Sequence, residues 1–138
     1  MTFKYRGIFS KLELIPENIN DFMLIIDYIF AKYNITENLH CEVICHERDK
    51  PEFFGEQIAL STDESLNYYQ QIDFQFSHEL VHLVQYHKGL IKVERLDYNS
   101  TFEIEARNEA KYIMHELLGY KNYTICDWYL HSMCTVFK

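Results

Sequence analysis

One segment, FSHELVHLVQYHKG at residues 76–89, limits what this chain can fold into more than any other. Its polar residues are embedded among apolar ones, namely Phe76, Leu80, Val81, Leu83 and Val84. This pattern predicts a buried helix that runs from about Ile72 to His87. Gly89 lies just past its end, where a left-handed C-terminal cap favours glycine. Neighbouring elements must therefore pack around this helix.

The segments on either side of the helix predict one α+β domain that spans residues 1–138. The predicted elements are a strand or turn within 1–14, a helix at 17–33, strands at 39–46 and 53–61, and a helix at 101–118. Pro16 suits a first helical position, and Ser100 or Thr101 can cap the last helix, which ends at Gly119. We expect a small mixed sheet packed against the 72–87 helix and against the glutamate-bearing helix that follows it.

Composition and charge exclude several classes of partner. The formal net charge is -8 and the sequence has no run of basic residues, so no basic surface for nucleic acid is expected. The longest apolar run, 22–30, is too short for a membrane span and contains Asp27. Without a signal-peptide pattern the chain is expected to be cytoplasmic, with its 4 cysteines reduced.

His78, Glu79 and His82 form the pattern His-Glu-x-x-His on the buried helix. Four residues turn through about 400° on a helix, so the two histidines lie on one face, one turn apart. Two imidazole nitrogens can then reach one zinc ion, and Glu79 can take a proton from water on that ion. The alternative is an ordinary amphipathic helix in which both histidines pack without metal.

A catalytic zinc site needs a third protein ligand, and the next predicted helix offers Glu103. Ala106 and Ala110 share its face, and such small residues allow two helices to approach closely. Glu105 points about 200° away from Glu103 on a helix, so both cannot be ligands. Glu103 is the candidate on this small-residue face, and Glu105 and Glu109 are the alternatives.

HELVH followed by EIEAR resembles the gluzincin group of zinc metallopeptidases, in particular its minimal SprT-like and ImmA-like members. The resemblance covers roughly residues 53–118, through the order of the motifs. It implies a zincin-like fold in which His78, His82 and Glu103 bind zinc and Glu79 activates the zinc-bound water. The implied activity is peptide hydrolysis, by an endopeptidase rather than an exopeptidase. The alternative function is an inactive zincin-fold module that binds a peptide or protein partner as a regulator.

One residue departs from this resemblance. Arg107 stands where many gluzincins have an aspartate that orients the first histidine, and an arginine cannot accept the hydrogen bond. Glu105, Asn108 and Glu109 are possible substitutes. Gln85 shares the helix face of the histidines, where it either reaches the ligands or is simply a polar residue near a helix end.

The resemblance also implies where a substrate binds. A peptide or protein substrate would add as a strand along an edge strand of the sheet, here Phe54–Ser61. The group that stabilises the oxyanion is not fixed by the sequence. The candidates are Tyr112, His115, Tyr129 and His131.

Overall fold

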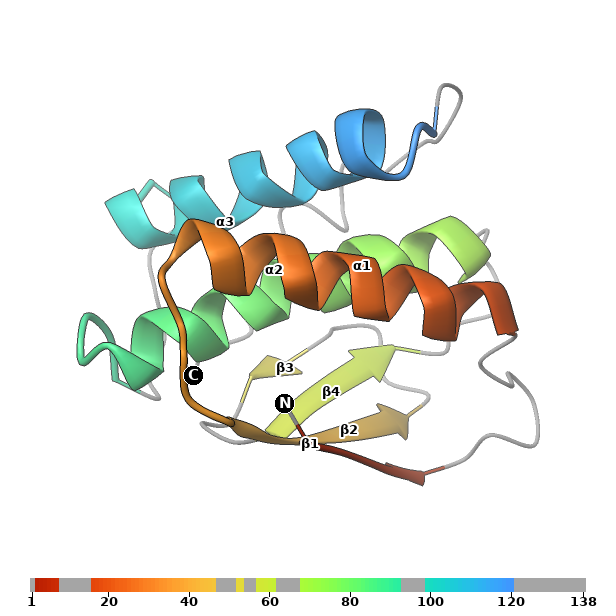
Figure 1. Cartoon of the computed structure of the whole chain (residues 1–138), viewed down its shortest axis with the longest axis horizontal. Coiled ribbons are helices and arrows are strands. Elements are labelled where there is room, and N and C mark those ends of the chain that lie inside the picture. Colours follow the sequence, from red (N-terminus) through yellow and green to blue (C-terminus); the bar gives the residue numbers. More distant parts are fainter. Residues whose placement is uncertain are drawn as a thin grey trace.

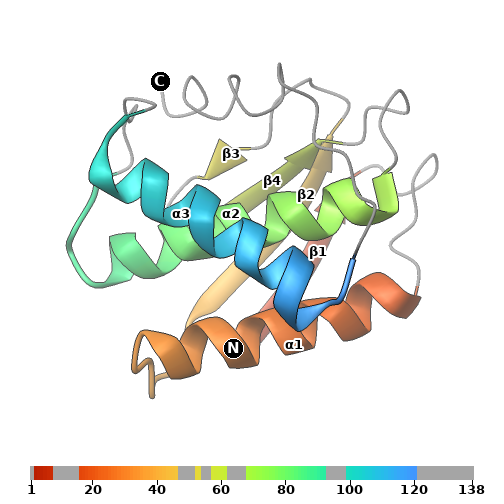
Figure 2. The same ribbon diagram turned by 90° about the horizontal axis from the view of Figure 1, so that it is seen from above.

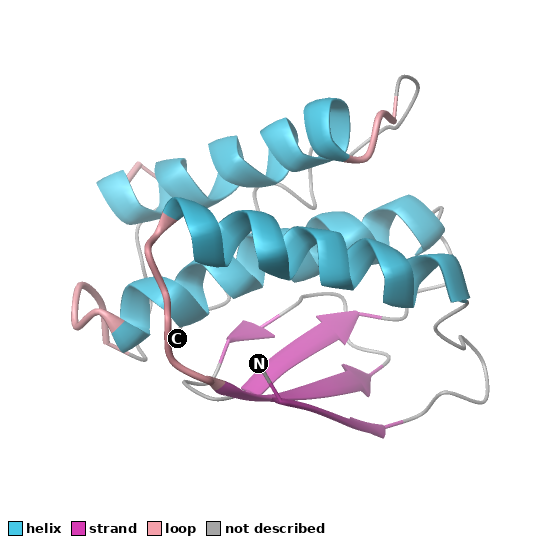
Figure 3. Cartoon of the chain, viewed as in Figure 1, coloured by secondary structure: helices cyan, strands magenta, loops and turns pink. Residues whose placement is uncertain are grey.

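The computed structural model of the protein describes residues 2–7, 16–46, 52–53, 57–61, 68–92 and 99–120. In chain order its elements are β1 (Thr2–Gly7), α1 (Pro16–Lys32), β2 (His40–His46), β3 (Glu52–Phe53), β4 (Gln57–Ser61), α2 (Tyr68–His87), α3 (Thr101–Tyr112) and the π-helical turn η1 (Ile113–Leu117). Helices α1 and α2 lie over one face of the sheet (Figures 1 and 3). Helix α3 lies on their far side and runs from above α2 toward α1 (Figure 2). The predicted α+β class is confirmed.

The described strands form a sheet in the order β1-β2-β4-β3. Strands β1, β2 and β4 are parallel, whereas β3 pairs antiparallel with β4 through Phe53 and Ile58. The predicted strand 53–61 is therefore two strands, separated at residues 54–56, which lie outside the described ranges. The prediction that Phe54–Ser61 forms an edge strand is wrong for β4, because β2 and β3 flank it and β3 forms the edge.

Helix α2 occupies the centre of the molecule. Every residue from 72 to 85 is buried, because the sheet, α1 and α3 all contact this helix. On the sheet side α2 contacts β3 and β4, and the buried Val43 and Ile58 belong to the same hydrophobic core as α2. On the α1 side, Phe22 stacks on Phe76 with ring centroids 3.9 Å apart. The prediction that the segment around the histidines is a buried helix is confirmed.

The helix ends follow from local sequence. Gly89 has a φ of +74° and its N–H donates to the carbonyl of Tyr86, so the predicted left-handed cap of α2 is present. Gly119 likewise has a φ of +69°. The predicted helix 101–118 differs in its last turn, because α3 ends at Tyr112 and continues as η1. There the N–H of Leu118 donates to the carbonyl of Ile113, a π-type hydrogen bond that widens the turn.

A cluster of polar side chains joins the first half of α2 to its neighbours. The hydroxyl of Tyr120 lies 2.7 Å from Asp73 Oδ2 and 2.8 Å from Asp21 Oδ2. Asn18 Nδ2 donates to Asp73 Oδ1 at 3.1 Å. Burial, together with a hydrogen bond to Asp21, raises the pKa of Asp73 to about 9, against the opposing hydrogen bonds from Tyr120 and Asn18. Asp73 therefore retains a proton at neutral pH in the folded protein.

Candidate metal centre

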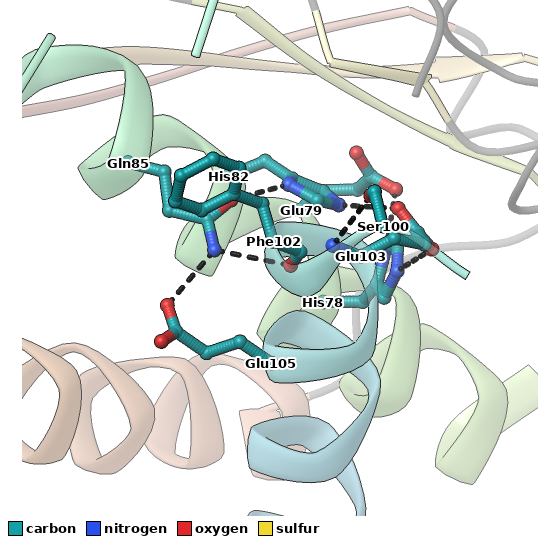
Figure 4. Close-up of polar contacts among 8 residues, drawn as sticks. All are labelled: His78, Glu79, His82, Gln85, Ser100, Phe102, Glu103 and Glu105. Atoms are coloured by element: carbon teal, nitrogen blue, oxygen red, sulfur yellow. Dashed lines mark hydrogen bonds and ion pairs between the residues drawn. The ribbon is translucent and has the colours of Figure 1, made fainter. Parts of the chain in front are cut away.

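Helix α2 places two histidines and a glutamate at its centre, and α3 brings a second glutamate against them (Figure 4). His78 and His82 are one helical turn apart, with ring centroids 4.7 Å from each other. The side chains of His78, Glu79, His82 and Glu103 are all 0% exposed. Residues from two separate segments therefore meet in one buried cluster.

Glu103 faces both histidines at once. Its Oε1 lies 2.8 Å from His78 Nε2, and its Oε2 lies 3.0 Å from His82 Nε2. One ligand atom from each of these three residues lies within 4.8 Å of the other two. Two ligand atoms that bind one ion at about 2.0–2.1 Å in tetrahedral geometry lie about 3.4 Å from each other. Small side-chain movements would bring the three ligand atoms to this separation. His78, His82 and Glu103 thus form a group that can hold a metal ion.

The sequence of α3 explains how Glu103 reaches this position. Ser100 caps the helix, and its hydroxyl accepts a hydrogen bond from the Glu103 N–H at 3.2 Å. Ala106 and Ala110 are both 0% exposed on the packed side of α3, as the small-residue pattern predicted. The first turn of α3 is therefore fixed at the place where its carboxylate has to meet the histidines.

The electrostatics of the cluster favour positive charge between the ligand atoms. Burial lowers the pKa of His78, but the facing carboxylates of Glu103 and Glu79 outweigh this effect and raise it to about 10. Burial raises the pKa of Glu103, but the two histidines outweigh it and lower that pKa to about 2. At neutral pH Glu103 is therefore ionised and His78 carries a proton, which a metal ion bound at His78 would have to replace.

Glu79 lies beside the ligand group rather than within it. Its Oε1 is 2.8 Å from His78 Nδ1, the nitrogen that faces away from Glu103. Its Oε2 is buried and has no hydrogen-bond partner within the described ranges. From the sequence we expected a residue of α3 to accept the hydrogen bond that orients His78. In the structure Glu79, on α2, is that acceptor. Adjacency in sequence was the only signal for this contact.

The alternative third ligands lie elsewhere. Glu105 Oε1 accepts a hydrogen bond from Gln85 Nε2 at 2.9 Å, so this carboxylate is directed to the side of the cluster. Glu109 turns toward α1, where it accepts from Tyr28 at 3.0 Å and pairs with Lys32. Glu103 and Glu105 thus face different partners, as their spacing on a helix predicted, and the choice of ligand stays a prediction.

Of the other described residues named from the sequence, only Gln85 is shown to contact a proposed ligand. Its Oε1 lies 2.8 Å from His82 Nδ1. Arg107 is buried, at 8% exposed, on the packed side of α3. Asn108 is exposed and therefore does not take part in the buried cluster.

Of the four candidates for oxyanion stabilisation, the two that the structure describes lie outside the buried cluster. Tyr112 is 49% exposed and stacks on Tyr28 of α1 with centroids 5.4 Å apart. His115 is exposed on η1. Tyr129 and His131 lie outside the described residues.

Comparisons with models of protein families, with curated proteins and with solved structures found no match to this chain. Among the described helices, none combines the length and the apolar character needed to cross a bilayer. A function for the chain therefore has to be argued from the chemistry of the cluster itself.

Proposed function

We propose that this protein is a zinc-dependent peptidase with a zincin-like, gluzincin-type site. In this proposal His78, His82 and Glu103 hold the ion, and Glu79 is the general base. The observation that carries the proposal is that both carboxylate oxygens of Glu103, from a separate helix, face the Nε2 atoms of the two histidines. Two imidazoles and one glutamate are a ligand set of catalytic zinc sites in peptidases.

The orphaned oxygen of Glu79 supports the presence of a further species in the site. Glu79 Oε2 is buried without a hydrogen-bond partner among the described residues, and leaving a buried carboxylate oxygen unpaired is costly. A water molecule at Oε2 would supply the missing partner. The donor set and this oxygen together fit a hydrolytic metal centre.

The two oxygens of Glu79 have separate tasks in the proposed reaction. When bound, zinc lowers the pKa of a coordinated water to about 7 and polarises the substrate carbonyl. Oε1 accepts from His78 Nδ1 and so holds the carboxylate in one orientation. Oε2 takes the proton from the attacking water as the new C–O bond forms, and Glu79 returns that proton to the amine as the C–N bond breaks.

The burial of the site favours a second candidate, a metal-binding module without activity. All four side chains are 0% exposed, and enclosed sites are typical of structural rather than catalytic zinc. Structural sites, however, usually have four protein ligands, whereas the described residues supply three. This set of three ligands and the adjacent base lead us to prefer the peptidase. The inactive module would serve as a regulator that binds a peptide or protein partner.

The proposed substrate is a peptide or protein bound in extended form. The edge of the described sheet on this side is β3, not β4, so a substrate strand would add beside Glu52–Phe53. Helix α2 contacts both β3 and β4, which brings this edge close to the helix that carries the histidines. The net charge of -8 disfavours nucleic acid as a direct partner.

The decisive variant is Glu79→Gln, which has nearly the same shape but cannot accept a proton. We expect it to retain about one zinc per chain and to lose hydrolysis of a fluorogenic peptide library by about 10²- to 10⁴-fold. Glu116→Gln, an exposed glutamate of η1, is the matched control and should keep full activity. Full activity in Glu79→Gln would refute the role of the base. Zinc-loaded wild type that cleaves no peptide would favour the regulatory module, and bound iron in place of zinc would overturn the proposal.

A further inference from the structure

Gln85 makes hydrogen bonds on both sides of its amide group. This side chain is 0% exposed and lies three residues after His82 on α2. Its Oε1 is 2.8 Å from His82 Nδ1. Its Nε2 donates to the carbonyl of Phe102 at 3.1 Å and to Glu105 Oε1 at 2.9 Å (Figure 4). Gln85 therefore links a histidine of α2 to the first turn of α3.

The partners of Gln85 determine which way its amide faces. A backbone carbonyl and an ionised carboxylate can only accept hydrogen bonds, so both require the NH2 group of the amide. The amide oxygen must then face His82, and an oxygen there requires a hydrogen on Nδ1. His82 is thereby held with its hydrogen on Nδ1 and with Nε2 directed at Glu103. This is the arrangement in which Nε2 can bind a metal ion.

We propose that Gln85, held by Glu105, is a positioning residue that sets the tautomer and ring orientation of His82 for metal binding. This inference rests on the proposed metal centre but not on hydrolysis. It assigns a role to each of the two glutamates of EIEAR. Glu103 binds the ion, and Glu105, on another side of the same helix, orients a ligand through Gln85.

The two histidines are consequently positioned by different means. The Nδ1 of His78 faces a carboxylate, Glu79, directly. The Nδ1 of His82 faces a neutral amide, whose orientation depends on a carboxylate one step further away. The Glu105 carboxylate also interacts with Tyr33, just past the end of α1, where burial and the charge and hydrogen bond of Glu105 raise the tyrosine pKa. Residues of α2 and α3 therefore orient His82, and Tyr33 contacts the Glu105 carboxylate at the end of this chain of contacts.

The test is the zinc affinity of the full-length protein, measured by competition with a chromophoric chelator. Gln85→Leu removes the hydrogen bond to His82 and the hydrogen bonds to Phe102 and Glu105, and we expect about a 10- to 100-fold weaker zinc affinity. Glu105→Ala should weaken binding in the same direction, and it tests the positioning role from a half-buried site if Gln85→Leu does not fold. Glu105→Gln keeps an acceptor for the Gln85 amide and should bind zinc as wild type does.

The exchanged pair Q85E/E105Q makes the test specific. A glutamate at position 85 can accept from His82 Nδ1, and a glutamine at position 105 can donate to that glutamate. We therefore expect the double variant to recover affinity relative to Gln85→Leu, which a purely structural role would not predict. The ¹⁵N shifts of the His82 ring should show hydrogen on Nδ1 in wild type and in Q85E/E105Q, and a changed tautomer population in Gln85→Leu.

Glu109→Ala is the matched control, because this residue of α3 contacts α1 but not the histidines. It should leave zinc affinity unchanged. Equal affinity in wild type and Gln85→Leu, with wild type binding zinc, would overturn the positioning role and leave the metal centre standing. An equal loss in Glu109→Ala would also overturn it, because the effect would then reflect helix packing alone. Wild type that binds no zinc would overturn both this inference and the proposed metal centre.

Discussion

Helix α2 carries two buried polar clusters whose charges are arranged in opposite ways. The His78 ring faces the carboxylates of Glu79 and Glu103, so that a positive charge on this imidazole and the negative charges stabilise one another. Around Asp73, two carboxylates face a single phenol hydroxyl, which has only one hydrogen to donate. The first cluster keeps a carboxylate ionised in the core, whereas the second keeps one protonated.

This difference shows that burial alone does not decide the charge of a side chain. Asp73 and Glu103 are both 0% exposed, yet the pKa of Asp73 is raised to about 9 and that of Glu103 is lowered to about 2. For Asp73 burial is the largest effect and prevails, whereas for Glu103 the facing histidines outweigh burial. The ionised Glu103 can therefore bind a metal cation. The protonated Asp73, which is hydrogen-bonded to Tyr120, instead links α2 to the segment after η1.

Removing the carboxylate from the first cluster should have the largest effect. Glu103→Ala deletes the proposed third ligand and breaks a buried ion pair. We expect zinc affinity to fall by more than the 10- to 100-fold typical of residues that only orient a ligand. We also expect the metal-free protein to lose about 3–5 kcal/mol of unfolding free energy. Mass spectrometry of metal content and urea unfolding measure the two effects. Full zinc retention would mean that the wrong ligand has been chosen.

Replacing Asp73 by a neutral residue should have an intermediate effect on the free energy of unfolding, and this effect should be stabilising rather than destabilising. Between about pH 4 and pH 9 the folded protein holds a proton on Asp73 that the unfolded chain has lost. The contribution of Asp73 to stability therefore falls as pH rises through this window, by at most about 1.4 kcal/mol per pH unit. Asp73→Asn removes this dependence and should gain stability relative to wild type as pH increases. Urea unfolding at several pH values from 5 to 9 tests this, and parallel curves for the two proteins would contradict it.

The sequence was sufficient for features that depend on local spacing. Helical periodicity located α1 and α2, Gly89 located the end of α2, and the i, i+4 spacing put His78 and His82 on one face. Small residues on α3 correctly indicated which helix face would approach α2. In each case the deciding interactions lie within one or two helical turns of each other, so a short stretch of sequence contains the information.

The sequence was insufficient wherever the deciding partner lies far along the chain. The position of β4 inside the sheet depends on its pairing with both β2 and β3, which no local pattern reveals. The cluster at Asp73 joins it to Tyr120, 47 residues away. The face of Gln85 could be predicted, but its partners Phe102 and Glu105 depend on how α2 and α3 dock. Zinc as the ion and Glu79 as the base remain predictions.

The smallest predicted effect comes from the Ser100 hydroxyl, whose removal should affect the cluster around His78 but not the cluster around Asp73. Ser100→Ala removes the N-cap of α3, which should cost about 1 kcal/mol of unfolding free energy. Because this hydroxyl bonds to the N–H of Glu103, zinc affinity should also fall slightly, whereas the pH dependence contributed by Asp73 should not change.

The matched control is Ser77→Ala, in the middle of α2. The Ser77 hydroxyl donates to the backbone carbonyl of Asp73 at 2.8 Å, a bond that adds little to a helix already satisfied by its own backbone. This variant should leave zinc affinity unchanged, although it lies next to His78 in sequence. If both serine variants reduce zinc affinity equally, the site responds to general loosening of the helices. If only Ser100→Ala does, the capped first turn of α3 is what holds Glu103 against the histidines.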